Sequence, residues 1–142
     1  MTDNDARGGV IVCGIDGSSG ARRALQEAIR TAARRGDRVR AVAVYEPPEM
    51  WAAWGYGAAS GVALPDPDAL HGDELTLPEI EVETRAGRPA EVLVELAGDA
   101  DGLVVGHRGR GAFGSVVLGS VGLGCVLRAS CPVTVVPDPV AA

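Results

Sequence analysis

The chain alternates short apolar runs with segments of helical periodicity, and this alternation limits its fold more than any other feature. Residues 9–16 (GVIVCGID) are an apolar run that ends in turn residues, a pattern typical of a buried strand. Apolar residues then recur at helical spacing from Ala21 to Ala32, behind two N-cap candidates, Ser18 and Ser19, and Gly36 follows a basic last turn. Repeated alternation of this kind predicts a parallel sheet covered by helices.

The whole order is strand, helix, strand, irregular connection, strand, helix, strand, helix, strand. Right-handed crossovers then favour an α/β fold with a five-stranded parallel open sheet in the order 3-2-1-4-5. The first two crossovers are expected on one face and the last two on the other. Ligands of open α/β sheets bind at the carboxyl ends of strands where the order reverses, so Asp16 and Gly106 are predicted to meet there. The later strands are predicted at 39–45, 80–86, 102–106 and 132–136, and the later helices after Pro89 and over 120–129.

Residues 46–78 break the pattern, because they contain five prolines and four glycines. We interpret them as an irregular connection with at most a short helix, so that the helix expected after the second strand is shortened or missing. Loss of this helix would expose one face of the sheet over the second and third strands. The polar alternation of Glu81, Glu83 and Arg85 fits a solvent-exposed face there. The aromatic residues of the connection, which are Trp51, Trp54 and Tyr56, are predicted to cover the remainder or to face a protein partner, with a disordered loop as the alternative.

The length and charge of the chain limit the classes of function that it can have. Its 142 residues suit one domain, 1–142, with residues 1–8 expected to be disordered. All thirteen basic residues are arginines, which excludes chemistry that needs lysine. The net charge of −6 disfavours nucleic acid and anionic membranes as partners. Residues 102–137, however, contain three arginines and no acid, so they carry +3 and the remainder −9, which indicates one anion site.

The three cysteines and the first residues of the chain favour a soluble domain that has neither a disulfide framework nor a signal peptide. The cysteines show no CxxC spacing, which argues against a disulfide framework or a zinc site, and we interpret them as buried, inert thiols. The start has no signal-peptide pattern, and no apolar run is long enough to span a membrane. A cytoplasmic location is therefore expected.

A glycine-rich loop at 106–120 is the strongest candidate for a binding site. Its backbone N–H groups can form a nest for phosphate, and the helix that starts near Ser120 presents free N–H groups and a positive dipole end. Arg108 and Arg110 can add charge. Three interpretations stay open: a dinucleotide fingerprint, a glycine loop without a ligand, and a cradle for the phosphates of a mononucleotide. The first is disfavoured because one helix and one strand alone follow the loop.

The spacing Gly106-x2-Gly109-x9-Gly119-Ser120 resembles the ATP-binding motif of universal stress proteins, G-2x-G-9x-G-S/T. The turn at residues 16–18 and the closing strand at 131–136 also resemble that family, and the likeness covers nearly the whole chain. It implies that ATP, ADP or AMP binds, with Mg2+ held mainly by phosphate oxygens and water. The implied nucleotide-binding residues are Gly14, Asp16, Val44, Gly106, Arg108, Gly109, Gly119, Ser120 and Val121.

In detail, the resemblance implies that Asp16 lies by the ribose or the metal–phosphate group and that Val44 contacts adenine. The glycines and arginine at 106–109 would line the ribose and the inner phosphates, and residues 119–121 would receive the outer phosphates. Each residue also has a structural alternative: Asp16 as a turn or cap residue, Val44 as strand core, and Arg108 as a solvated charge.

The implied function is a regulatory module of the stress response rather than an enzyme. The sequence offers no combination of a nucleophile, a base and a group that orients the base, as catalysis would need. His107 is interpreted as a loop residue. The alternatives are a dimeric protein-interaction module that binds no nucleotide and a slow ATPase. A homodimer is expected through the last strand, because an exposed valine-rich edge favours pairing across a two-fold axis. Gly122 and Gly124 are expected to weaken the last helix by about 1 kcal/mol each.

Overall fold

A computed structural model describes residues 8–45, 78–107 and 118–137 of the chain. They form one sheet of five strands in the order β3-β2-β1-β4-β5, and every neighbouring pair is parallel. The predicted fold class and strand order are therefore confirmed. The strands are β1 (Val10–Ile15), β2 (Arg38–Tyr45), β3 (Ile80–Ala86), β4 (Gly102–Gly106) and β5 (Val133–Val136).

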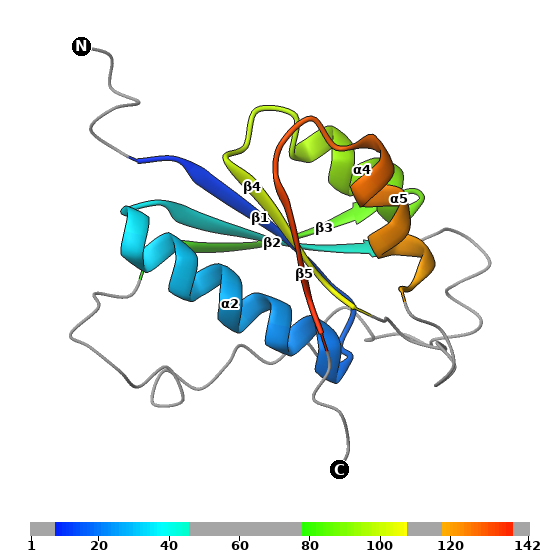
Figure 1. Cartoon of the computed structure of the whole chain (residues 1–142), viewed down its shortest axis with the longest axis horizontal. Helices are drawn as coiled ribbons and strands as arrows, with labels where there is room; N and C mark the ends of the chain where they lie inside the picture. The colour runs from blue at the N-terminus through cyan, green and yellow to red at the C-terminus, as the bar shows by residue number, and fades with distance from the viewer. Residues whose placement is uncertain (1–7, 46–77, 108–117, 138–142) are drawn as a thin grey trace.

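Helices cover both faces of this sheet. Helix α2 (Ser19–Arg35) lies along one face, while α4 (Pro89–Leu96) and α5 (Ser120–Arg128) lie side by side on the other (Figure 1). This is the expected consequence of right-handed crossovers, because the chain moves outward from β1 to β3 and then back across the sheet. The connection between β2 and β3, with its predicted aromatic cover, lies outside the described residues.

The core forms two layers, one on each side of the sheet. Buried side chains of β1, β2 and β4 alternate between them: Ile11 and Val39 face α2, whereas Val12 and Val42 face α4 and α5. Because both faces of the central strands are covered, these strands are apolar along most of their length, and the two arginines of β2 lie in its first three residues. No helix among the described residues has the length and apolar character that crossing a bilayer requires.

Both ends of α2 follow from local sequence. The Ser18 hydroxyl accepts a hydrogen bond from the Ala21 N–H at 3.1 Å, and Gly36 closes the helix in the left-handed region at φ 74°. The predicted start and stop of this helix are thereby confirmed. Small and apolar residues at helical spacing, from Ala21 to Ala32, lie against the sheet.

Two glycines in α5 have a packing role that the sequence did not indicate. A Cβ at Gly124 would lie 2.7 Å from the Cβ of Ala90 in α4, and a Cβ at Gly122 would lie 2.8 Å from the Leu118 side chain and 3.6 Å from the Gly106 carbonyl oxygen. The predicted cost of these residues to helix propensity is therefore offset by close approach of α5 to α4 and to the end of β4.

The edge strand β3 differs from its predicted pattern. Glu83 is in register with Val42, so Glu81, Glu83 and Arg85 lie on the face covered by α4 and not on the α2 face. On the α2 face, Val82 is 54% exposed. The three charged residues were predicted on the face of the sheet that α2 covers, and this prediction was wrong. Alternation shows which residues share a face but not which helix covers that face.

Candidate functional site

The turn between β1 and α2 is closed by its own side chains. The Asp16 carboxylate accepts a hydrogen bond from the Ser18 N–H at 2.9 Å, across Gly17 at φ 80°. Ser18 in turn caps α2 through its hydroxyl. The positive end of α2 is therefore stabilised from within the chain by a hydroxyl and a carboxylate. Asp16 has the turn role that was its structural alternative, and its side chain remains partly exposed.

The start of α5 is built differently. Its N-cap is Gly119, so no side chain caps it, and its first turn contains no acid. The Gly119 N–H donates to the His107 carbonyl at 2.9 Å, which ties the helix start to the end of β4 but occupies one amide of the predicted phosphate nest. The N–H groups of the first helical turn, from Ser120 onward, have no acceptor within a helix. Ser120 itself is exposed.

Gly106 lies between the starts of these two helices. A Cβ at this position would come within 2.9 Å of the carbonyl carbon and oxygen of Gly20, in the first turn of α2. On the opposite side, its carbonyl oxygen lies close to Gly122 in the first turn of α5. The amino ends of both helices therefore converge on the carboxyl end of β4, next to β1, and their positive dipole ends act on the same region.

Gly14 and Val44 contribute to packing beneath this region. A Cβ at Gly14 would lie 2.7 Å from the Leu93 side chain, so glycine lets α4 approach β1. Val44 is 9% exposed and belongs to the core layer that also contains Leu93. The strand-core alternative for the Val44 side chain is therefore observed.

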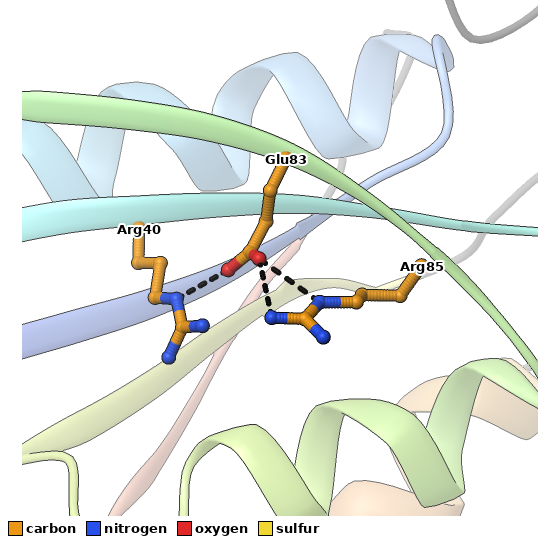
Figure 2. A network of polar contacts seen from close by, with 3 residues as sticks. All are labelled: Arg40, Glu83 and Arg85. Atoms are coloured by element: carbon orange, nitrogen blue, oxygen red, sulfur yellow. Dashed lines mark hydrogen bonds and ion pairs between the residues drawn. The ribbon is translucent and has the colours of Figure 1, made fainter.

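A charged network at the β2–β3 edge escaped the sequence reasoning. Arg85 is in register with Val44, and its guanidinium donates to the Glu83 carboxylate at 2.9 Å (Figure 2). The same carboxylate also accepts from Arg40 of β2. Burial opposes ionisation of Glu83, but its hydrogen bonds with both arginines and their charges prevail and lower its pKa. The spacing of Glu83 and Arg85 by two residues was the available signal, since it places both on one face of a strand.

Thus the structure brings together some of the predicted site residues. Asp16, Gly106 and the start of α5 gather at the carboxyl edge of the sheet, where β1 and β4 are neighbours. Gly14 and Val44 lie within the adjoining strands. Arg108 and Gly109 lie outside the described residues, as does the rest of the glycine loop up to residue 117.

The cysteines offer little chemistry near this edge. Cys13 and Cys125 are buried, which confirms the prediction for these two, whereas Cys131 is only partly buried. Burial raises the pKa of the Cys13 thiol far above its usual range, and burial together with nearby Cys131 raises that of Cys125 to about 11. Protonated thiols are poor nucleophiles.

The fold and the clustered helix starts define a doubly wound α/β domain with its loops gathered at the switch point of the sheet. Residues 9–137 match the model of the universal stress protein family, and the chain belongs to that family. A universal stress protein of Thermus aquaticus is 35% identical over 132 residues, which cover 89% of this chain and 96% of the relative. One from Mycolicibacterium smegmatis is also 35% identical over 132 residues, but there the match spans 45% of the relative's length.

Solved structures show the same fold. A universal stress protein in complex with cAMP is 29% identical, covers 92% of this chain and 97% of its own, and has a TM-score of 0.62. The protein UspA from Lactobacillus plantarum is 21% identical, covers 90% of this chain and 97% of its own, and has a TM-score of 0.69.

Proposed function

We propose that this universal stress protein binds an adenine nucleotide, with the phosphates at the start of α5, and acts as a regulatory module rather than an enzyme. The observation that carries the proposal is the contrast between helix starts. Helix α2 is capped by Ser18 and α4 has Glu91 in its first turn, whereas α5 begins at Gly119 with neither a capping side chain nor an acid. An anion supplied by a ligand complements such an end.

The charge distribution supports an anionic ligand. The sequence from 102 to 137 holds no acid in a chain of net charge −6, and this stretch contains β4, α5 and β5. A phosphate group at the start of α5 would therefore meet backbone dipoles without a carboxylate from the same stretch. Asp16 follows β1, the neighbour of β4, and its carboxylate already accepts a hydrogen bond from the Ser18 N–H.

The residues that would hold the nucleotide follow from this placement. Ser120 and Val121 would donate backbone N–H groups, and the Ser120 hydroxyl would add a hydrogen bond to a phosphate oxygen. Asp16 would approach the ribose or a phosphate-bound Mg2+. The roles of Gly14, Val44, Arg108 and Gly109 rest on the family resemblance. ATP, ADP or AMP remains the proposed ligand, and cAMP enters the comparison because a 29% identical relative was solved with it.

Magnesium would arrive with the nucleotide. The described residues contain no group of three or more His, Cys, Asp or Glu placed to hold a metal ion. Mg2+ keeps several waters and binds through a carboxylate or two plus substrate phosphates, so Asp16 alone would suffice as its protein ligand.

The experiment compares two serines that occupy the same position in different helices. Ser120 is the first residue of α5 and Ser19 is the first residue of α2, and both are exposed. Ser120→Asp would place a carboxylate at the proposed phosphate position, and we expect it to weaken ATP binding at least about tenfold in calorimetry, because like charges then meet at close range. Ser19→Asp is the matched control and should retain most of the affinity.

The outcomes separate the alternatives. Equal losses in both variants would contradict the placement at α5, since any added charge near the edge would then act alike. No binding of ATP, ADP, AMP or cAMP by the wild-type protein, with or without Mg2+, would favour the module that binds no nucleotide. Sustained phosphate release over many turnovers would favour the ATPase.

We also infer a homodimer that pairs β5 with its copy. The two outer strands of the sheet differ in charge: β3 carries Glu81, Glu83 and Arg85, whereas β5 carries no charged residue. Charged edges resist pairing with another strand and uncharged ones do not. A protein partner at residues 46–78 and a cytoplasmic location remain predictions from the sequence.

A further inference from the structure

The outward face of α2 carries a row of arginines that the nucleotide proposal does not use. Helix α2 contains five arginines and one acid, Glu27, in a chain whose net charge is −6. Four of these arginines are exposed on the side away from the buried residues, and we name them the α2 arginine face: Arg22, Arg23, Arg30 and Arg34. At about 100° per residue, the last three lie within about 40° of one another around the helix axis.

The α2 arginine face lacks the ion pairs that most other described arginines make. Five described arginines lie beside a carboxylate: Arg35, Arg40, Arg85, Arg88 and Arg128. Within the described part of the chain, no carboxylate forms an ion pair with a member of the α2 arginine face. This holds even for Glu27, which is four residues from Arg23 and three from Arg30. The guanidinium groups of the face are therefore available to a carboxylate from outside.

The stability of α2 does not explain this arrangement. Arg30 and Arg34 are four residues apart, and like charges at this spacing destabilise a helix by about 0.2–0.5 kcal/mol. The first turn of α2 contains no acid, although its positive dipole end favours one, and Arg22 and Arg23 follow directly after it. Of the nineteen acids in the chain, one lies on this helix. The concentration of positive charge on one face is therefore better explained by a partner.

The sheet beside α2 adds an apolar floor to the arginines. Gly20 of α2 packs on Gly106 of β4, and Arg22 lies about 200° around the helix axis from Gly20. Arg22 therefore points to the other side of α2, where β2 and β3 lie. On the α2 face of the sheet, β3 exposes Val82, at 54%, and Thr84. Guanidinium groups and a small apolar area thus lie on the same side of the molecule.

An acidic segment of a protein fits this surface better than a nucleic acid or a membrane does. Guanidinium groups pair with carboxylates through two parallel hydrogen bonds. Helix α2 has no aromatic side chain on which a base could stack, and its apolar side is buried against the sheet and cannot enter a bilayer. The helix carries +4 and the rest of the chain −10, so an extended polyanion would also meet repulsive charge.

The length of the row sets the length of the segment. From Arg23 to Arg34 the helix rises by about 16 Å, which about five residues of an extended segment would span. A segment of this size contacts the helix and the neighbouring strand, while charges more than about 8 Å away are screened at physiological ionic strength.

We propose that the α2 arginine face, together with Val82, is a docking site for a short acidic and partly apolar segment of a partner protein. Carboxylates of the segment pair with the arginines, and an apolar side chain of the segment lies on Val82. This site is distinct from the proposed phosphate position, because α5 lies on the opposite face of the sheet (Figure 1). It gives the proposed regulatory module a surface through which to contact a partner.

The test uses the full chain and a fluorescent peptide of alternating glutamate and leucine, with binding followed by fluorescence anisotropy. The double variant Arg30→Gln, Arg34→Gln should weaken binding at least about tenfold, because two guanidinium–carboxylate contacts are lost. The double variant Arg88→Gln, Arg128→Gln is the matched control. It removes the same charge from exposed positions on the other face of the sheet and should bind as the wild type does.

Two further measurements separate the components of the site. Val82→Ser should weaken binding about threefold, since it removes apolar contact and leaves every charge in place. A peptide with glutamine in place of glutamate should bind at least about tenfold more weakly than the acidic one. Circular dichroism and thermal melting of each variant guard against misfolding, and ATP affinity, measured on the same proteins, should not change in either double variant.

Each outcome supports or overturns the proposal. No binding of the acidic peptide by the wild type at physiological salt would overturn it, and an equal loss in both double variants would overturn the assignment to α2. Tighter binding of duplex DNA, or of vesicles made from equal parts of phosphatidylserine and phosphatidylcholine, would overturn the choice of a protein partner. Failure of ATP binding alone would contradict the proposed function and leave the docking site standing.

Discussion

Gly106 at the end of β4 lies against Gly20 in the first turn of α2, so close that a Cβ on Gly106 would sit 2.9 Å from the Gly20 carbonyl group. Gly106, the first glycine of the spacing that resembles the family's ATP-binding motif, therefore has a packing function of its own. It lets the start of α2 approach β4 from one side while Gly122 approaches from the other. The geometry of the proposed site depends on this contact.

Gly106→Ala is expected to destabilise the protein by about 1–3 kcal/mol, because overpacking against backbone forces α2 outward. Thermal and urea unfolding would measure the loss, and calorimetry would show weaker ATP binding. Gly98→Ala, in an exposed turn where the added Cβ is 3.3 Å from the Glu95 carbonyl oxygen, is the control and should cost less. Equal costs for the two would show that the α2 contact is unimportant.

Gly124→Ala sets helix propensity against packing. Alanine raises propensity by about 1 kcal/mol, but its methyl group would lie 2.7 Å from the Ala90 Cβ. We expect net destabilisation of about 1 kcal/mol or more, since the clash separates α4 from α5. In a double-mutant cycle, adding Ala90→Gly should restore part of this loss beyond additivity. A stabilised Gly124→Ala single variant would contradict the close packing.

Glu83→Gln should lose stability in a pH-dependent way. Because Arg40 and Arg85 lower the folded-state pKa of Glu83, its contribution is present above the unfolded-state pKa of about 4.3 and is lost as the pH falls through the folded-state value. The wild type should exceed the variant by about 0.5–1 kcal/mol at pH 7, a size typical of exposed ion pairs. The two should converge well below pH 4.

Urea unfolding from pH 7 to pH 2 would measure this difference. High salt is the accompanying check, because screening should reduce it at neutral pH. A difference independent of both pH and salt would mean that Glu83 acts through packing alone.

The cysteines should react in an order set by their environments. Cys131 is only partly buried and should react first with a thiol reagent in the native protein. At pH 8, a pKa of about 11 leaves Cys125 more than about 100-fold less ionised than a free thiol near 8.5. Mass spectrometry of timed labelling would give the order, with Cys131→Ser as the control. Rapid labelling of Cys13 would contradict its burial.

Much of the fold followed from local sequence. The strand order came from alternation and handedness, and the ends of α2 came from Ser18 and Gly36. These features are local because capping and periodicity depend on residues a few positions apart. The glycine spacing also located β4 and the start of α5 correctly.

Only part of the candidate site could be predicted from the sequence, because local patterns do not show which distant segments come into contact. Asp16 and Gly106 were expected at one edge because they end neighbouring strands, and they do so. The motif could not show that the Gly119 N–H donates a hydrogen bond to the His107 carbonyl. Nor could it show that the missing side chain at Gly14 makes room for Leu93. Both facts depend on which atoms of distant segments meet.

The sequence by itself determined the parallel sheet, its order and the start of α5 near Ser120, because periodicity and handedness act locally. Only the tertiary structure decided that α5 starts at Gly119 without a capping side chain, that Glu83 faces α4, and that Ala90 leaves no room for a side chain at Gly124. The physical reason is that burial and steric contact belong to pairs of elements, and a pattern within one element does not specify what covers it.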